Sequence, residues 1–230
     1  MKKITYLLFP SVLLAAFIVW TALVKVVDIQ YIGPAGFLGF YHLNTQINDF
    51  VQALNTSDYA LITNILMFGA IATVLPFAII GIVQLVKRKD LKKVDPIIYV
   101  ILASYIAMAV IYLTFEIVKI NYSPLSNVNP DDGLKASYPS SHVLVTIVML
   151  GAAVMGLLHY VKMSKLLKVL VNIVFIIIAF LAAFFRLYSG QHYFTDIIGG
   201  LLISFTILVA TNSLKRYIEQ DKEEAKEDNE

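Results

Sequence analysis

The sequence predicts an all-α protein, a bundle of six transmembrane helices with both termini in the cytoplasm. Two observations predict this class. Of the 230 residues, 59% are hydrophobic and only 15% are charged, with a mean hydropathy of +0.76; a soluble domain is near half apolar and about a quarter charged. The apolar residues also fall into blocks of about 20, the length that crosses a ~30 Å hydrocarbon core. The blocks lack the alternation that strands of a membrane barrel need.

Six apolar blocks define the predicted spans. In chain order they cover about residues 4–27, 59–86, 96–118, 140–161, 169–185 and 194–214. They form one membrane domain over residues 1–216, followed by a charged cytoplasmic tail at 217–230. The first block is longer than the roughly 7–15 apolar residues of a signal peptide and has no clear small-residue cleavage site after it. We therefore expect an uncleaved anchor.

The basic residues predict the orientation of the spans. Most Lys and Arg residues lie before the first span, in the links 87–93 and 162–168, and directly after the sixth span. The opposite side holds only Lys25, Lys119, Lys135 and Arg186. Basic residues mark the cytoplasmic side of a membrane protein. We therefore expect a multi-pass protein of the cell membrane whose other three connections face outward.

The outer segment 28–58 contains a second helical pattern. Apolar residues recur at helical spacing between Phe37 and Leu54. The sequence leaves two arrangements open: a helix lying flat on the outer leaflet, or a cap packed over the bundle.

The polar residues of interest all fall at the outer ends of spans. These are Ser140, Ser141 and His142 at the start of the fourth span, Arg186 at the end of the fifth, and His192 and Asp196 at the start of the sixth. Ionisable groups at membrane depth indicate function by default. Because the topology brings all of them to one face, we expect them to form a single site.

These residue types suit phosphate chemistry. If the helix has begun by His192, then Asp196 lies on the same face and can fix the imidazole tautomer, which favours a nucleophile or base. Arg186 can make a forked contact with phosphate oxygens. Ser140 and Ser141 add donors near a helix start, and His142 can protonate a departing oxygen.

Other interpretations exist for the same residues. Serines near a helix start are usually caps, and an interfacial arginine can simply reach for water. A metal site of His142, His192 and Asp196 is the weaker option, since the one further histidine on this face, His42, is in a distant loop. No metal or cofactor is expected, and the net charge of +2 does not indicate a nucleic-acid partner.

At these residues the chain resembles the type 2 phosphatidic acid phosphatase superfamily, whose motifs are Lys-x6-Arg-Pro, Pro-Ser-Gly-His and Ser-Arg-x5-His-x3-Asp. The second motif reads Pro139-Ser140-Ser141-His142, and the third reads Arg186-x5-His192-x3-Asp196 after Phe185. The resemblance implies that His192 attacks phosphorus and Asp196 orients it. It also implies that His142 protonates the leaving group, that Arg186, Ser140 and Ser141 hold the phosphoryl oxygens, and that no metal is required.

The first motif departs from the family pattern. Counting back from Pro124, Ser123 stands at the arginine position and Glu116 at the lysine position. Lys119 and Lys135 are candidates to supply a substitute charge for phosphate binding. Loss of a cationic clamp costs on the order of 10²–10³ in rate.

The sequence thus favours a phosphatase acting on a lipid phosphate or diphosphate at the extracytoplasmic face through a phosphohistidine. Undecaprenyl diphosphate, phosphatidylglycerol phosphate and phosphatidic acid are all possible substrates. Two alternatives remain open: a catalytically impaired relative that binds lipid or acts as a scaffold, and a lipid phosphotransferase. A transporter is less favoured, because paired broken helices at mid-membrane depth are not evident.

Overall fold

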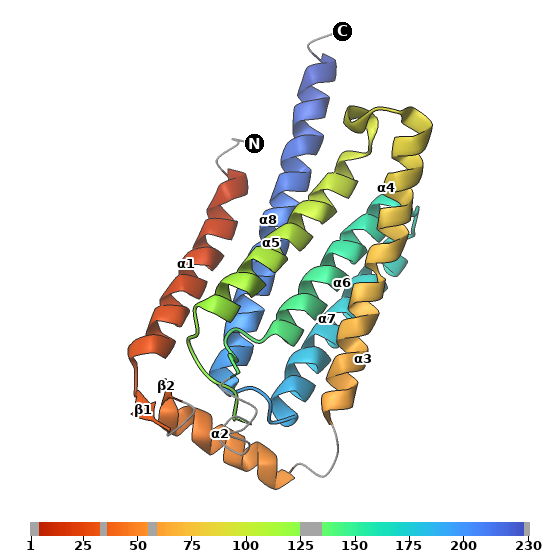
Figure 1. Ribbon diagram of the computed structural model, residues 1–230. Helices are drawn as coiled ribbons and strands as arrows, with labels where there is room; N and C mark the ends of the chain where they lie inside the picture. The colour runs from red at the N-terminus through yellow and green to blue at the C-terminus, as the bar shows by residue number, and fades with distance from the viewer. Residues whose placement is uncertain (1–4, 33–35, 55–58, 125–134, 228–230) are drawn as a thin grey trace.

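The computed structural model describes residues 5–32, 36–54, 59–124 and 135–227. Most of them are helical (Figure 1). The elements in chain order are α1 (Thr5–Val26), β1 (Gln30–Tyr31), β2 (Phe37–Leu38), α2 (Tyr41–Leu54), α3 (Tyr59–Ala72), α4 (Val74–Arg88), η2 (Leu91–Lys93), α5 (Pro96–Ile117), α6 (Ser141–Tyr160), α7 (Lys165–Tyr188) and α8 (Phe194–Glu227).

The six predicted spans are confirmed as helices long and apolar enough to cross a membrane. They are Tyr6–Val26, Tyr59–Arg88, Pro96–Ile117, Ser141–Tyr160, Lys165–Tyr188 and Phe194–Asp221. The chain is therefore a multi-pass helical membrane protein. The charged segment after residue 216 continues α8 as a helix to Glu227.

The second span is built from two helices, α3 and α4, which meet at Thr73. Pro76 lies in the first turn of α4. Proline has no backbone N–H, and its ring clashes with the carbonyl four residues earlier, so one continuous helix through this point is disfavoured. The Thr73 hydroxyl bonds instead to the carbonyl oxygen of Ala70, at 2.6 Å.

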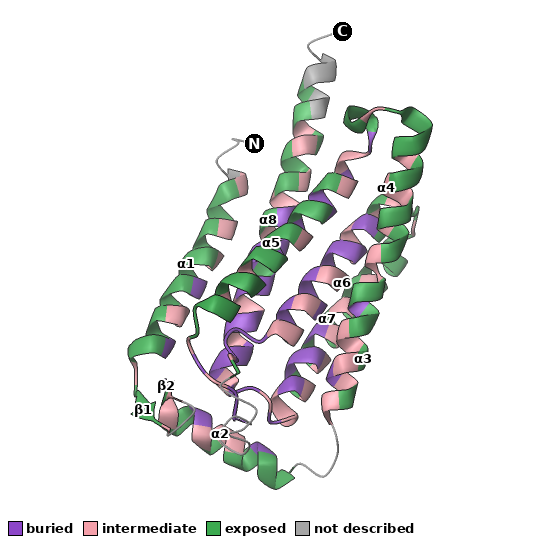
Figure 2. Cartoon of the chain, viewed as in Figure 1, coloured by how far each residue is buried: buried purple, intermediate pink, exposed green. Residues whose placement is uncertain are grey.

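Helix α6 is the centre of the bundle. Half of its membrane window is buried, against 6–28% for the spans formed by α1, α3–α4, α5 and α7. It packs against α3, α5, α7 and α8, while α1 packs against α8. Figure 2 shows the buried residues concentrated on the inward faces of α6 and α8. Small residues at these contacts, such as Ala152, Ala179 and Ala183, let helices approach closely where no water is present to drive burial.

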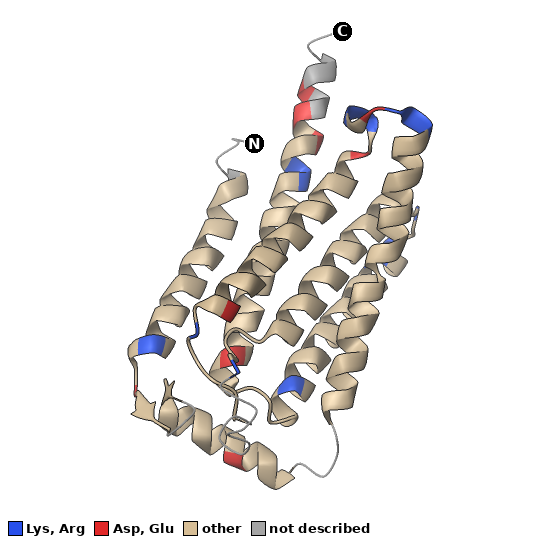
Figure 3. Cartoon of the chain, viewed as in Figure 1, with Lys and Arg blue, Asp and Glu red and all other residues tan. Residues whose placement is uncertain are grey.

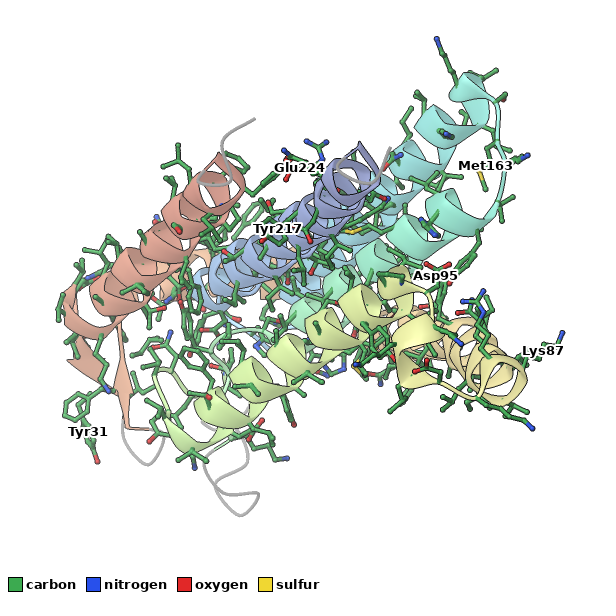
Figure 4. All side chains as sticks on the ribbon, turned by 90° about the horizontal axis from the view of Figure 1, so that it is seen from above. Tyr31, Lys87, Asp95, Met163, Tyr217 and Glu224 are labelled. Atoms are coloured by element: carbon green, nitrogen blue, oxygen red, sulfur yellow. The ribbon has the colours of Figure 1, made fainter. Side chains whose placement is uncertain are left out.

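The two ends of the bundle differ in charge. Lys and Arg cluster at the α4–α5 link, at the end that carries both termini, and α8 shows one basic patch followed by acidic patches toward its C-terminal end (Figure 3). In the view from above, the Lys87 side chain points away from the bundle at this end, whereas Tyr31 projects from the opposite, β-hairpin side (Figure 4). Assignment of the basic end to the cytoplasm stays a prediction.

Helix α2 lies across the end of the bundle opposite the termini (Figure 1). It buries Asn44 and Val51. The Asn44 side chain donates to the carbonyl oxygen of Gly39 at 2.8 Å and to Thr195 Oγ1 at 2.9 Å, and it accepts from the Thr195 backbone N–H at 3.2 Å. Of the two arrangements left open by the sequence, the structure therefore has the packed cap.

Candidate active site

The residues predicted to form a site lie under the α2 cap, where α6 begins, α7 ends and α8 begins. A sharp turn after α7 connects Arg186 to His192. Gly190 has φ +65°, and an added Cβ would lie 1.9 Å from Gln52 Nε2 on α2. A left-handed residue just after a helix end is most readily glycine. This turn returns the chain toward the bundle and places His192 two residues before the start of α8.

His192 is held by a backbone carbonyl. Its side chain is 6% exposed, and Nδ1 lies 2.8 Å from the carbonyl oxygen of Ser137. A carbonyl can only accept, so Nδ1 carries the proton and Nε2 keeps a free lone pair. Burial lowers the pKa of His192, and the charge of Arg186 lowers it further, against opposite effects from Asp196 and the Ser137 carbonyl. The imidazole is therefore neutral with Nε2 available as a nucleophile.

Asp196 acts differently from the sequence expectation. Helix α8 begins at Phe194, not at His192, so the two residues are not on one helix face. Oδ2 of Asp196 accepts the Tyr193 backbone N–H at 3.0 Å, which is half of a capping box. The His192 Nδ1 to Asp196 Oδ2 distance is 3.8 Å, too long for a hydrogen bond. The carboxylate thus acts on the His192 ring through its charge, and it separately caps the start of α8.

The loop before α6 is tied to α8. The Ser140 backbone N–H donates to the carbonyl oxygen of Asp196 at 3.0 Å. An added Cβ on Gly199 would lie 2.4 Å from the Tyr138 ring, so only glycine lets this loop lie so close to α8. Close packing here brings the Ser137 carbonyl to His192.

His142 and Arg186 both reach toward α3. The His142 Nε2 is 2.9 Å from Asn64 Oδ1. Arg186, 6% exposed, donates through Nη1 to Thr63 Oγ1 at 3.5 Å and to Gln191 Oε1. Two neighbouring polar residues of α3 therefore hold the histidine and the arginine.

Four buried side-chain atoms of the site have no hydrogen-bond partner within the described residues. They are Ser137 Oγ, Ser140 Oγ, His142 Nδ1 and Arg186 Nε. Buried polar groups nearly always form hydrogen bonds, because a buried group without a partner loses its hydrogen bonds to water and gains none to the protein. Hydroxyl and guanidinium groups of this kind can donate to an anion. Their grouping beside His192 is what an anion site requires.

A small cavity of about 20 Å³ opens beside His192. Its lining includes Ser137, Ser141, Tyr112 and Glu116. Such a volume admits a water-sized group, so a phosphoryl group enters only when lining side chains move. His192 lies buried in this lining, whereas Glu116 is exposed. The carboxylate therefore stands at the rim of the cavity.

Of the predicted site residues, only His192 and Ser141 belong to this lining; Arg186, Ser140, His142, Asp196 and both candidate lysines lie outside it. Lys119 lines a separate cavity of about 500 Å³ together with Lys25, and its Nζ is 6.0 Å from the centre of the Tyr122 ring. Lys135 is exposed, and its carbonyl oxygen accepts from the Ser123 N–H at 3.0 Å. Ser123 in turn donates its hydroxyl to the carbonyl oxygen of Gln191 at 3.0 Å. The arginine position of the first motif is thus occupied by a residue that holds the 189–193 turn.

Several residues of the site were missed by the sequence analysis. Asn121 is fully buried and donates to Asp196 Oδ1 at 3.1 Å and to Thr195 Oγ1 at 3.2 Å. The pair Thr63-Asn64 carried a usable signal, being two adjacent polar residues inside an apolar span. Asn121 and the Ser137 carbonyl carried none, since loop residues of these types are common. In the described parts of the chain, no three His, Asp or Glu side chains are grouped to hold one metal ion.

The fold and this site together define the class: a helical membrane protein with the fold of a PAP2-type transmembrane phosphatase. The family model of the PAP2 superfamily matches residues 117–219, which confirms the resemblance predicted from the motifs. That stretch contains the α6 start, the α7 end and the α8 start, and so every residue of the second and third motifs.

One solved structure is similar over nearly the whole chain. It is described as the first transmembrane PAP2 type phosphatidylglycerolphosphate phosphatase from Bacillus subtilis, with a TM-score of 0.64 and 19% sequence identity, covering 91% of this chain and 96% of that one. At this identity the likeness establishes the fold. Among curated proteins, none matches the sequence. The comparisons support a lipid phosphatase kind of function.

Proposed function

We propose that this chain hydrolyses a lipid phosphate or diphosphate at the extracytoplasmic membrane face, with His192 as the nucleophile. The observation that carries the proposal is the set of unpartnered buried atoms of Ser137, Ser140, His142 and Arg186 beside a neutral histidine. A structural His–Asp pair would need no such set around it. The match to the PAP2 family model supports the same chemistry.

In the first step, the Nε2 lone pair attacks phosphorus and the bond from phosphorus to the leaving oxygen breaks. The developing negative charge on the equatorial oxygens is met by Arg186, Ser140 and Ser141. His142 gives a proton to the leaving oxygen; Asn64 holds its Nε2, and its Nδ1 is unpartnered within the described residues. Nδ1 of His192 stays bonded to Ser137, which stabilises the ring as it gains positive charge.

In the second step, water attacks the phosphohistidine, with His142 taking its proton, and inorganic phosphate leaves. The nitrogen–phosphorus bond breaks, and the electron pair returns to Nε2. Asp196 stabilises the positive charge of the phosphorylated ring in both steps through its charge at 3.8 Å.

The test is phosphate release from a panel of lipid phosphates by the purified chain in detergent. His192→Ala is expected to abolish release while folding and membrane insertion persist. His159→Ala is the matched control, because His159 lies at the other end of α6 and contacts Asp95 at 3.6 Å. Wild-type turnover by His192→Ala would refute the mechanism.

A catalytically impaired, lipid-binding relative is the second candidate, favoured by Glu116 at the cavity rim and Ser123 at the arginine position. It predicts that the wild type releases no phosphate from any member of the panel, while Glu116→Lys with Ser123→Arg does. A labelled donor separates hydrolysis from phosphotransfer, because transfer would place the label on a second lipid rather than on free phosphate.

A further inference from the structure

Glu116 lines the same cavity as His192, yet the two differ in depth. His192 is 6% exposed, whereas Glu116 stands at the exposed rim, one helical turn from Tyr112 on α5. On the side of this cavity, a phosphoryl group on His192 would therefore face Ser137 and Ser141, whereas Arg186 and Ser140 lie outside the cavity lining. The group attached to that phosphate, on the side of the leaving oxygen, would meet the Glu116 carboxylate.

The carboxylate has no cation of its own in the described residues. No ion pair in this part of the chain includes Glu116. The cation of the site, Arg186, is on α7 and bonds to α3 and to Gln191. A carboxylate beside an anionic substrate repels it unless the substrate itself carries a positive charge at that place.

We infer that Glu116 selects phosphate monoesters whose alcohol carries a protonated amine close to the ester oxygen, and disfavours leaving groups that are themselves anionic. This inference rests on the proposed phosphatase function and narrows its substrate class. An ammonium group at the rim makes a charge-assisted hydrogen bond to Glu116. A second phosphate at the same place meets the carboxylate with a like charge, so diphosphates are poor substrates.

The test compares two lipids that differ by one charge: a long-chain 2-aminoalkyl phosphate and its N-acetyl derivative. The wild-type chain in detergent is expected to favour the free amine about 10-fold in kcat/KM, the size of one partly exposed charge-assisted contact. Glu116→Gln is expected to bring this ratio close to one. Asp49→Asn, which removes a carboxylate from the exposed surface of α2, is expected to keep the ratio.

A binding measurement separates this inference from the proposed function. In His192→Ala, thermal stabilisation by the amine-bearing lipid is expected to exceed that by the N-acetyl lipid, and the added Glu116→Gln removes the difference. If the wild type releases phosphate from neither lipid, the proposed hydrolysis is wrong. If the binding difference is nevertheless present, recognition of the amine by Glu116 is supported. Equal stabilisation by both lipids in His192→Ala, or a ratio unchanged by Glu116→Gln, overturns the inference.

Discussion

The ring nitrogen Nδ1 of His192 lies 2.8 Å from the carbonyl oxygen of Ser137, a residue 55 positions earlier in the chain. This contact, rather than a hydrogen bond to Asp196, sets the tautomer of the imidazole. It also joins the second and third sequence motifs physically, because Ser137 directly precedes the Tyr138–His142 segment that opens α6. The His192 ring is therefore held by the backbone two residues before the second motif.

The lowered pKa of His192 predicts a pH dependence of stability. The folded state keeps this ring neutral below its ordinary pKa near 6.5, while the unfolded chain binds the proton there. The stabilisation is therefore complete above about pH 6.5 and is lost as pH falls below it. The unfolding temperature in detergent should fall less between pH 8 and pH 5 for His192→Gln than for the wild type. An equal difference in the two proteins would contradict a neutral, buried His192.

Arg186→Lys is expected to lower kcat/KM by about 10²-fold, because lysine keeps the charge but loses the planar fork that we propose contacts two phosphoryl oxygens. Phosphate release at varied lipid concentration measures the effect. Arg88→Lys is the control: Arg88 lies at the other end of the bundle and donates to the carbonyl oxygen of Lys93. Equal kcat/KM for Arg186→Lys and the wild type would remove Arg186 from the phosphate clamp.

Asn121→Ala is expected to destabilise the fold by about 1–3 kcal/mol, since it leaves the buried Asp196 Oδ1 without the donor found 3.1 Å away. Activity should fall with it, because the carboxylate loses its fixed position beside His192. Asn172→Ala gives the comparison: Asn172 is exposed on α7, and its side-chain amide donates to the Lys168 carbonyl oxygen at 2.8 Å. Equal unfolding temperatures for the two variants would argue against a role of Asn121 in holding Asp196.

Gly190→Ala is expected to cost about 1–2 kcal/mol of stability, because an L residue is strained at φ +65°. The added methyl would also overlap the Gln52 side chain of the α2 cap. Gly69→Ala in α3 is the opposite case, with nothing within 4 Å of its added Cβ and ordinary helical φ. It should be neutral or slightly stabilising. Similar unfolding temperatures for both variants would show that the turn after α7 tolerates a side chain.

Much of the fold followed from the sequence alone. Six long apolar blocks require six helices, because an unpaired backbone cannot lie in hydrocarbon. The Pro76 break within the second span was not predicted, since the apolar pattern continues across it and only the backbone reports the interruption. For the segment 28–58, the sequence allowed either a helix lying flat on the outer leaflet or a cap packed over the bundle. Contacts of Asn44 with Gly39 and Thr195 decided it in favour of a cap.

The sequence by itself determined the helical membrane class and the gathering of Ser140, Ser141, His142, Arg186, His192 and Asp196 at one end, because span lengths and motif positions are local properties. Only the tertiary structure decided what holds each group. Ser137, Asn64, Thr63 and Asn121 come from loops and helices distant in sequence, and hydrogen bonds between such partners leave no periodic trace. Tertiary structure also put Glu116 on the cavity rim and both candidate lysines outside the lining. The effect of a charge depends on its distance in space from the site, and the number of residues between two positions does not give that distance.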